Sequence, residues 1–265
     1  MTTYGVDQLS GARIQAILDN GGWPQSSRVI DAGTITVSGA QEVTGSLLGQ
    51  MQEVAAAELG QVFVSREGDL VFRQRYSELL STASGTSKGT FGPNPTDTCP
   101  YRNLSFAYKD DQLKNQVSAS RVNGTTRTTV QDNASIALYG VRSEDLSDLL
   151  VTTEQAVRQI AELYLRVYAS PEYFPEQMRL TPEAKPSTLY PQVLGRELRD
   201  RITVQFTAPG GIARTVGCFV DGIAHTITPG SWETTFNLTT TATYDAFFIL
   251  NSSTSGVLGT NTLGA

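Results

Sequence analysis

Residues 201–238 read RITVQFTAPGGIARTVGCFVDGIAHTITPGSWETTFNL, and this stretch decides the fold class of the chain. Apolar and polar side chains alternate within it, and short turns containing glycine or proline separate the alternating runs. Alternation with a period of two is typical of half-buried strands, and short turns join such strands antiparallel. The pattern predicts strands over 201–206, 217–220, 224–227 and 232–238. Together they would form a small antiparallel β-barrel or sandwich over 191–243.

Helical patterns lie earlier in the chain. Apolar side chains recur at three- and four-residue steps over 10–20, 46–59 and 153–167, which predicts three amphipathic helices. Ser10 is a candidate cap of the first helix, and Gly60 follows the end of the second. Further strands are predicted over 28–37, 61–64, 70–73, 103–107, 116–121 and 125–131.

The order of these patterns predicts an α+β fold. It has an N-terminal α+β module, a mixed β and helical middle region, and the C-terminal barrel or sandwich followed by an extended arm. Proline-rich stretches separate the modules because proline interrupts both helices and strands. The predicted boundaries are 1–80 for the first module, 81–100 for a linker, 101–190 for the middle module, 191–243 for the barrel and 244–265 for the arm.

Charge and hydropathy exclude several classes of protein. The net charge is −6, so there is no basic surplus for neutralising phosphates, and nucleic-acid specificity is not expected. The uncharged runs are broken by Ser, Thr, Asn and Gly before they reach the roughly 20 apolar residues of a membrane span, so stable membrane insertion is not expected. The first residues lack the basic and apolar regions of a secretory signal, which favours assembly in the cytoplasm.

Residues that could support catalysis are few. His225 is the only histidine and lies in a strand pattern, where a hydrogen-bonded structural role is expected. No glycine-rich phosphate motif is present, and no pair of carboxylates is singled out for glycoside hydrolysis. We therefore expect no enzyme activity, no catalytic residue and no cofactor. Cys99 and Cys218 are expected to be two unpaired thiols.

Two charged clusters allow more than one interpretation. Glu144, Asp145 and Asp148 could bind a hard cation, but they lack the ligand spacing of an EF-hand. They also precede a predicted helix, and acidic side chains are common there because they stabilise the helix N-terminus. No metal site is therefore predicted there. Residues 196–201 alternate three arginines with Glu and Asp, and we expect a solvated face or a network of subunit salt bridges rather than an anion site.

The C-terminal arm contains the candidate interface. Its apolar run carries about 500 Å² of apolar side-chain surface, and leaving that surface in water would forgo on the order of 10 kcal/mol. A partner surface is therefore expected for this run. The residues of the run are Phe247, Phe248, Ile249 and Leu250.

Several motifs together resemble the minor tail proteins of long-tailed actinobacterial phages. The C-terminal motifs are ELRDRITV at 197–204, CFVDGIAHTI at 218–227 and PGSWETTFNL at 229–238. Similar motifs earlier in the chain are RVIDAG at 28–33, LKNQV at 113–117 and DNASI at 132–136. These motifs are signatures of packing and turns rather than of catalysis.

The resemblance implies a baseplate-hub-like component of the tail tip, which is a structural protein of the virion assembled in the host cytoplasm. The implied role is a ring that connects the tail tube to tip or receptor-binding proteins. The implied partners are the chain itself and other tail proteins, namely distal tail, tape-measure and tip or receptor-binding proteins. A homotrimer is expected because hubs of this family adapt a six-fold tube to a three-fold tip, and a hexamer is the alternative.

The chain departs from the family pattern at its N-terminus, and two other functions are alternatives to the tail-tip role. Hubs of this type usually begin with a further tube-like β-barrel, for which the residues before Ser10 leave no room. A separate protein would then supply that barrel, or the chain would belong to a different ring. A receptor- or carbohydrate-binding module is the first alternative, since Trp23 and Trp232 lie beside turn prolines. A cell-wall hydrolase is the second, and the single histidine counts against it.

Overall fold

The computed structural model describes residues 2–3, 6–39, 42–43, 45–77, 86–108, 112–170, 173–208 and 210–241. The fold is α+β, as predicted. The described residues form two compact units, each built from two separate stretches of chain. Unit 1 contains the residues up to Ser77 together with 112–170, and unit 2 contains 86–108 together with the residues from Tyr173 onward. This division differs from the modules expected in chain order, because the chain passes between the units more than once.

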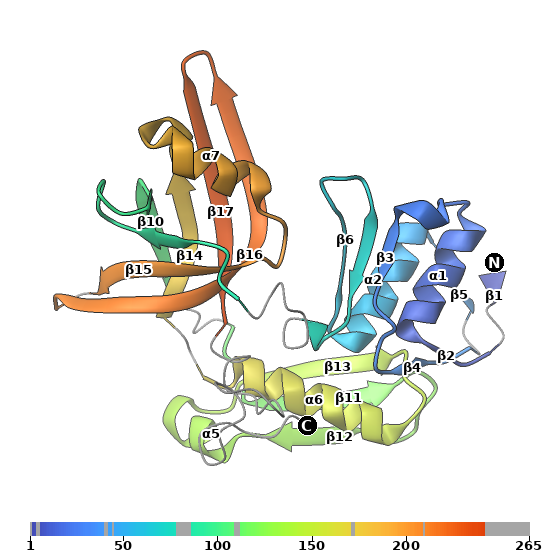
Figure 1. The fold of residues 1–265 in the computed structure, drawn as a ribbon. Coiled ribbons are helices and arrows are strands. Elements are labelled where there is room, and N and C mark those ends of the chain that lie inside the picture. Colours follow the sequence, from blue (N-terminus) through green and yellow to red (C-terminus); the bar gives the residue numbers. More distant parts are fainter. Residues whose placement is uncertain are drawn as a thin grey trace. The chain divides into compact units, whose positions relative to one another are not determined.

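Unit 1 combines helices with small sheets (Figure 1). Its helices are α1 (Ser10–Asn20), η1 (Gln25–Ser27), α2 (Leu47–Glu58), α5 (Asn133–Tyr139) and α6 (Glu154–Tyr168). Its strands are β1 (Thr2–Thr3), β2 (Gln8–Leu9), β3 (Arg28–Ile30), β4 (Thr36–Val37), β5 (Glu42–Val43), β6 (Gln61–Val64), β7 (Leu70–Arg73), β11 (Gln116–Arg121), β12 (Thr128–Gln131) and β13 (Ser143–Leu149). The sheets are ordered β3-β7-β6 and β12-β11-β13, with the short pairs β1-β5 and β2-β4 beside them.

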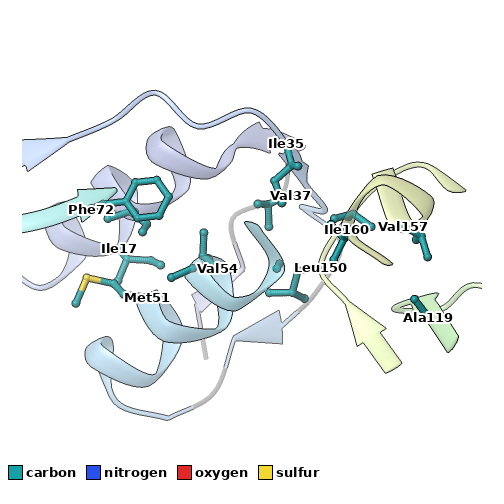
Figure 2. Close-up of a cluster of buried hydrophobic side chains, with 14 of the residues drawn as sticks. Ile17, Ile35, Val37, Met51, Val54, Phe72, Ala119, Leu150, Val157 and Ile160 are labelled. Atoms are coloured by element: carbon teal, nitrogen blue, oxygen red, sulfur yellow. The ribbon is translucent and has the colours of Figure 1, made fainter. Parts of the chain in front are cut away.

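One hydrophobic core joins the two stretches of unit 1. Figure 2 shows Ile17, Val54 and Phe72 from the N-terminal stretch in the same cluster as Val157 and Ile160 of α6. Each of these side chains is buried. The backbone links the stretches too, because the amide of Ser38 donates to the carbonyl of Leu150 at 3.2 Å. Unit 1 is therefore one folding unit in spite of the gap in its sequence.

Unit 2 is a curled seven-stranded sheet in the order β10-β14-β17-β16-β15-β8-β9, with one helix packed on it (Figure 1). Its strands are β8 (Thr90–Gly92), β9 (Cys99–Pro100), β10 (Asn103–Tyr108), β14 (Tyr173–Leu180), β15 (Arg201–Ala208), β16 (Ile212–Thr228) and β17 (Ser231–Thr240). The helical segments are η2 (Pro182–Ala184) and α7 (Pro186–Gly195). The sheet is larger than the barrel expected over 191–243, because strands from two earlier stretches join it.

The curl of the sheet brings its ends together. The edge strands β9 and β10 are separated in sequence only by Tyr101 and Arg102. The amide of Tyr101 donates to Gly92 at 3.0 Å, and the amide of Arg102 donates to Arg179 at 2.8 Å. The Phe106 ring of β10 also meets the Phe206 ring of β15, with centroids 4.8 Å apart. These contacts connect both ends of the sheet across the curl.

Several predicted elements need correction. The stretch predicted as one strand over 28–37 forms two short strands, β3 and β4. The predicted strands 217–220 and 224–227 form a single strand, β16, with a bulge between Val220 and Gly222. Ser10 does not cap α1, because its hydroxyl donates to Glu58 instead and the cap position is Leu9. Leu59, rather than Gly60, takes the left-handed conformation after α2, with φ 54°.

Candidate interaction surfaces

The predicted interface run, Phe247 to Leu250, lies outside the described residues. Its role as an interface stays a prediction. Within the described part of the chain, no group of three or more His, Cys, Asp or Glu residues is arranged to hold a metal ion. None of the described helices is long and apolar enough to cross a membrane. Exposed apolar side chains and the edges of the sheets are the features of the described residues that could contact a partner.

The hairpin of β16 and β17 carries a cluster of three rings. Its strands pair without interruption from Gly222 opposite Asn237 to Thr228 opposite Ser231, and Pro229-Gly230 makes the turn. The indole of Trp232 lies between Tyr190 of α7, at a centroid distance of 5.4 Å, and His225, at 5.6 Å. Trp232 is half-buried there, whereas Ile227 opposite it on β16 is 67% exposed. In Figure 1 the turn of this hairpin extends beyond α7.

His225 is a hydrogen-bonded strand residue, as predicted. It pairs with Thr234 on β17, and its Nδ1 lies 2.9 Å from the Thr234 hydroxyl. The indole N–H of Trp232 donates to the same nitrogen at 3.3 Å. Because an N–H donor points at Nδ1, that nitrogen acts as an acceptor and the proton of the neutral ring lies on Nε2. No acid or second base among the described residues is hydrogen-bonded to this ring, so the contacts orient the side chain rather than activate it.

The charged residues 196–201 form pairs within the chain. Asp200 is 5% exposed and accepts from Lys88 and, at 3.5 Å, from Arg196. Arg199 pairs with Asp221, and its guanidinium lies 4.7 Å from the centre of the Phe219 ring. The cluster is therefore a network within the chain at the start of β15, rather than the solvated face that was one of the two expectations.

The acids 144–148 lie on strand β13 rather than directly before a helix. Glu144 pairs with Lys114 at 2.8 Å, and Asp145 pairs with Arg127 at 2.6 Å. Since both carboxylates face basic side chains of the same unit, they serve ion pairs here. The sequence could not show this, because their partners lie 18 residues or more away in the chain.

The two cysteines are unpaired and buried, as predicted. Burial raises the pKa of Cys218 to about 12 and also raises the pKa of Cys99. The thiolate is the nucleophilic form of cysteine, so a raised pKa lowers the fraction of each thiol that is nucleophilic at neutral pH. Neither residue fits a catalytic role.

An exposed apolar surface at the end of α5 was not predicted. Leu138 is 76% exposed, Val141 is 59% exposed and Tyr139 lies between them. Asn115, which is fully buried, holds this end in place, since its amide donates to the carbonyl of Gly140 at 2.8 Å and accepts from the amide of Arg142 at 2.7 Å. The only sequence feature that could have indicated this surface is the apolar run from Ile136 to Val141. Such a run is as typical of a buried strand as of an exposed helix end.

Two solved structures of tail proteins and one of a virion particle are similar to this chain, and each match covers 90% of it. A tail protein from Neisseria meningitidis matches with a TM-score of 0.57 and 14% identity, over 67% of its own chain. The 43 kDa tail protein of prophage MuSo2 from Shewanella oneidensis matches with a TM-score of 0.55 and 11% identity, over 65% of its own chain. A chain of the virion of a native gene transfer agent matches with a TM-score of 0.56 and 13% identity, over 49% of its own chain.

These matches establish a shared fold. The identities, at 11–14%, carry no residue-level function across, and this chain spans about two thirds or less of the lengths of those chains. No protein-family model matches the sequence, and no curated protein matches it either. The shared fold runs through both units, because a match over 90% of the chain cannot be confined to one of them.

Proposed function

We propose that this chain is a structural subunit of a phage tail tip, where it forms a baseplate-hub ring between the tail tube and the tip or receptor-binding proteins. The observation that carries the proposal is the fold, which is shared over 90% of the chain with proteins described as tail proteins and with a chain of a virion particle.

The proposed partners are other copies of the chain and the neighbouring tail proteins, namely distal tail, tape-measure and tip or receptor-binding proteins. The proposed oligomer is a homotrimer, with a hexamer as the alternative. Exposed apolar side chains at the ends of described elements, such as Leu138 and Ile227, are surfaces that assembly would cover. Phe247 to Leu250 is proposed as a further contact in the ring.

The test is the copy number of the chain in assembled tails. Native mass spectrometry of the purified chain and of intact tails should give three copies in a ring. Hexamers alone would rule out the trimer, and absence of the chain from purified tails would rule out the whole proposal.

Deleting residues 244–265 should leave unit 2 folded but prevent stable incorporation of the chain into tails. Incorporation of the truncated chain at the normal copy number would show that the arm is not an interface.

A receptor- or carbohydrate-binding module is the second candidate, and Trp23 is the observation that favours it. This side chain is 37% exposed, and its indole N–H donates to the carbonyl of Ser27 at 2.9 Å, which fixes the ring at the surface. Aromatic rings held in this way can stack on sugars. Trp232 fits less well because Tyr190 and His225 flank it. Glycan-array binding that is lost in Trp23→Ala but kept in Trp232→Phe would favour this candidate over a purely structural role.

A further inference from the structure

Among the described residues, the end of β15 and the start of β16 form a two-stranded ribbon that no third strand flanks. The two strands pair along their shared length, from Arg201 opposite Phe219 to Ala208 opposite Ile212. On the outer side of β15, β8 pairs only with Thr203 and Val204. On the outer side of β16, β17 begins to pair only at Cys218. Residues 205–208 and 212–216, which we call the ribbon, therefore lack a flanking strand among the described residues.

The edge of β16 over residues 212–216 lies in line with the part of β16 that pairs with β17. The amide of Thr241 donates to the carbonyl of Gly217 at 3.1 Å, so Gly217 directs its backbone groups away from β15. Backbone direction alternates along a strand, so Thr215 and Ala213 present the next outward N–H and C=O groups. The side chains over 212–215 are exposed, and Ile212 is 56% exposed. An unpaired and exposed edge of this kind is a template for a strand from another chain.

The charges of the ribbon and of the arm are complementary. Arg214 is the only charged residue of the ribbon, and it is exposed. Asp245 is the only charged side chain in residues 242–265, and it directly precedes the apolar run. Each segment therefore offers one charge of opposite sign next to apolar side chains.

The register decides which copy of the chain can join these charges. Thr240 lies opposite Cys218, so a direct continuation of β17 along its own β16 would place Tyr244 opposite Arg214. Asp245 would then lie opposite Ala213 and point to the other face of the sheet, since successive side chains alternate. The chain's own arm in this register cannot pair Asp245 with Arg214. A segment from another copy is free to take the register shifted by one residue.

We propose that residues 244–250 of a second copy add to the edge of β16 as an antiparallel strand, with Asp245 opposite Arg214. In this register Phe247 lies opposite Ile212, so that one face gains an ion pair and an apolar pair together. Both pairs fall at positions without ladder hydrogen bonds, where cross-strand side chains approach most closely. The proposal rests on the ring assembly proposed above. Only residues 242 and 243 separate the added strand from Thr241, and these three Cα steps span at most roughly 10 Å, so the proposal requires the two copies to bring the end of β17 and the edge of β16 close together.

A charge exchange in the full-length chain tests the ion pair. Arg214→Glu and Asp245→Arg should each raise the concentration at which half of the chains are assembled, by about three- to tenfold. The double variant should return it close to the wild-type value. Arg158→Glu is the control, because Arg158 is an exposed arginine on α6 of unit 1. If the double variant assembles no better than either single variant, the pairing is wrong.

A disulfide tests which copy supplies the strand. Ile212→Cys combined with Phe247→Cys should give covalent oligomers after oxidation, and the native cysteines will not interfere because both are buried. A covalently closed monomer, or no cross-link at all, would overturn the proposal. The ring itself is measured separately on the wild-type chain by native mass spectrometry. A wild-type oligomer without cross-linked oligomers contradicts the added strand alone, whereas a wild-type monomer contradicts the ring and the added strand together.

Discussion

Glu58 is a buried carboxylate that ties three parts of unit 1 together. Its side chain is fully buried at the end of α2. One carboxylate oxygen accepts from the hydroxyl of Ser10 on α1, and the other accepts from the amide and the hydroxyl of Thr34 at 2.7 and 2.8 Å. Every one of these donors would be left without a partner if the carboxylate were removed. A buried polar group without a partner costs about 1–3 kcal/mol, so Glu58 contributes strongly to the stability of unit 1.

Glu58→Ala should lower the free energy of unfolding of unit 1 by about 2–4 kcal/mol, because it leaves the hydrogen-bond donors of Ser10 and Thr34 without this acceptor. The measurement is chemical denaturation followed by circular dichroism. Glu53→Ala is the matched control, since Glu53 lies on the same helix with an exposed side chain, and it should change stability by less than about 0.5 kcal/mol. Equal effects of the two substitutions would show that the buried contacts of Glu58 do not stabilise the fold.

His225→Gln should preserve assembly and cost at most about 1 kcal/mol, the range of a neutral hydrogen bond. The side chain is exposed, and its hydrogen bonds go to Thr234 and Trp232 of the same hairpin. Glutamine can accept a hydrogen bond from either partner, so most of the local geometry should remain. Thermal unfolding and the yield of assembled tails measure the two effects. A variant phage that assembles normally but no longer infects would give His225 a functional role.

At the scale of the elements, a glycine determines how closely α1 approaches the neighbouring loop. A Cβ atom at Gly11 would lie 2.0 Å from the carbonyl oxygen of Asp31 and 2.7 Å from that of Ala32. The amide of Gly11 also donates to Ala32 at 3.1 Å, so the two backbones are in direct contact. Backbone carbonyls cannot rotate away as a flexible side chain can. A side chain at position 11 would therefore force α1 away from the loop.

Gly11→Ala should destabilise unit 1 by at least about 2 kcal/mol, although alanine is the better helix former. The control is Gly195→Ala at the end of α7, where no atom lies within 4 Å of the added Cβ. That change should be neutral or slightly stabilising, because it restricts the unfolded chain without a clash. Urea denaturation of both variants compares the two sites. A neutral Gly11→Ala would mean that α1 and the loop can separate at little cost.

Elements with a clear period or cap were predictable from the sequence, and elements formed against local preference were not. Thr153 accepts from the amide of Ala156 and begins α6, as the pattern indicated. Residues 186–195 contain Pro191, which removes a helical hydrogen bond, and no helix was predicted there, yet they form α7. Leu189 and Val193 are buried in the core of unit 2, so tertiary packing stabilises a helix that the local sequence disfavours.

The features of the candidate interaction surfaces also fall into those that the sequence predicts and those that it does not. The structural role of His225 and the free thiols could be read from the sequence because they depend on residue counts and on local strand pairing. The exposed end of α5 and the edge of β16 that no described strand pairs with could not be predicted, because exposure depends on where strands from distant parts of the sequence end. β8 and β17 both end before they cover the ribbon, and nothing in their own sequences indicates where their neighbours continue.

At the scale of the whole molecule, each unit is completed by a stretch that lies far away in sequence. The core of unit 1 contains Ile14 and Met51 from the first stretch and Val117, Val157 and Ile160 from the second. Hydrophobic patterns show which side chains are buried, but they do not show which segments are buried together. Proline-rich stretches therefore indicated boundaries along the chain, whereas the compact units are defined by packing across those boundaries.

This organisation predicts that unit 1 requires both of its stretches. A fragment of residues 1–77 would lose the side chains of the second stretch that share its hydrophobic core, such as Val117, Val157 and Ile160, so it should lack a cooperative unfolding transition. Residues 1–77 joined to 112–170 through about twelve Gly and Ser residues should fold, because the linker only has to replace the excursion through unit 2. Circular dichroism and amide proton dispersion distinguish the two proteins. A cooperative transition in the 1–77 fragment, equal to that of the joined protein, would mean that the second stretch is dispensable for the core of unit 1.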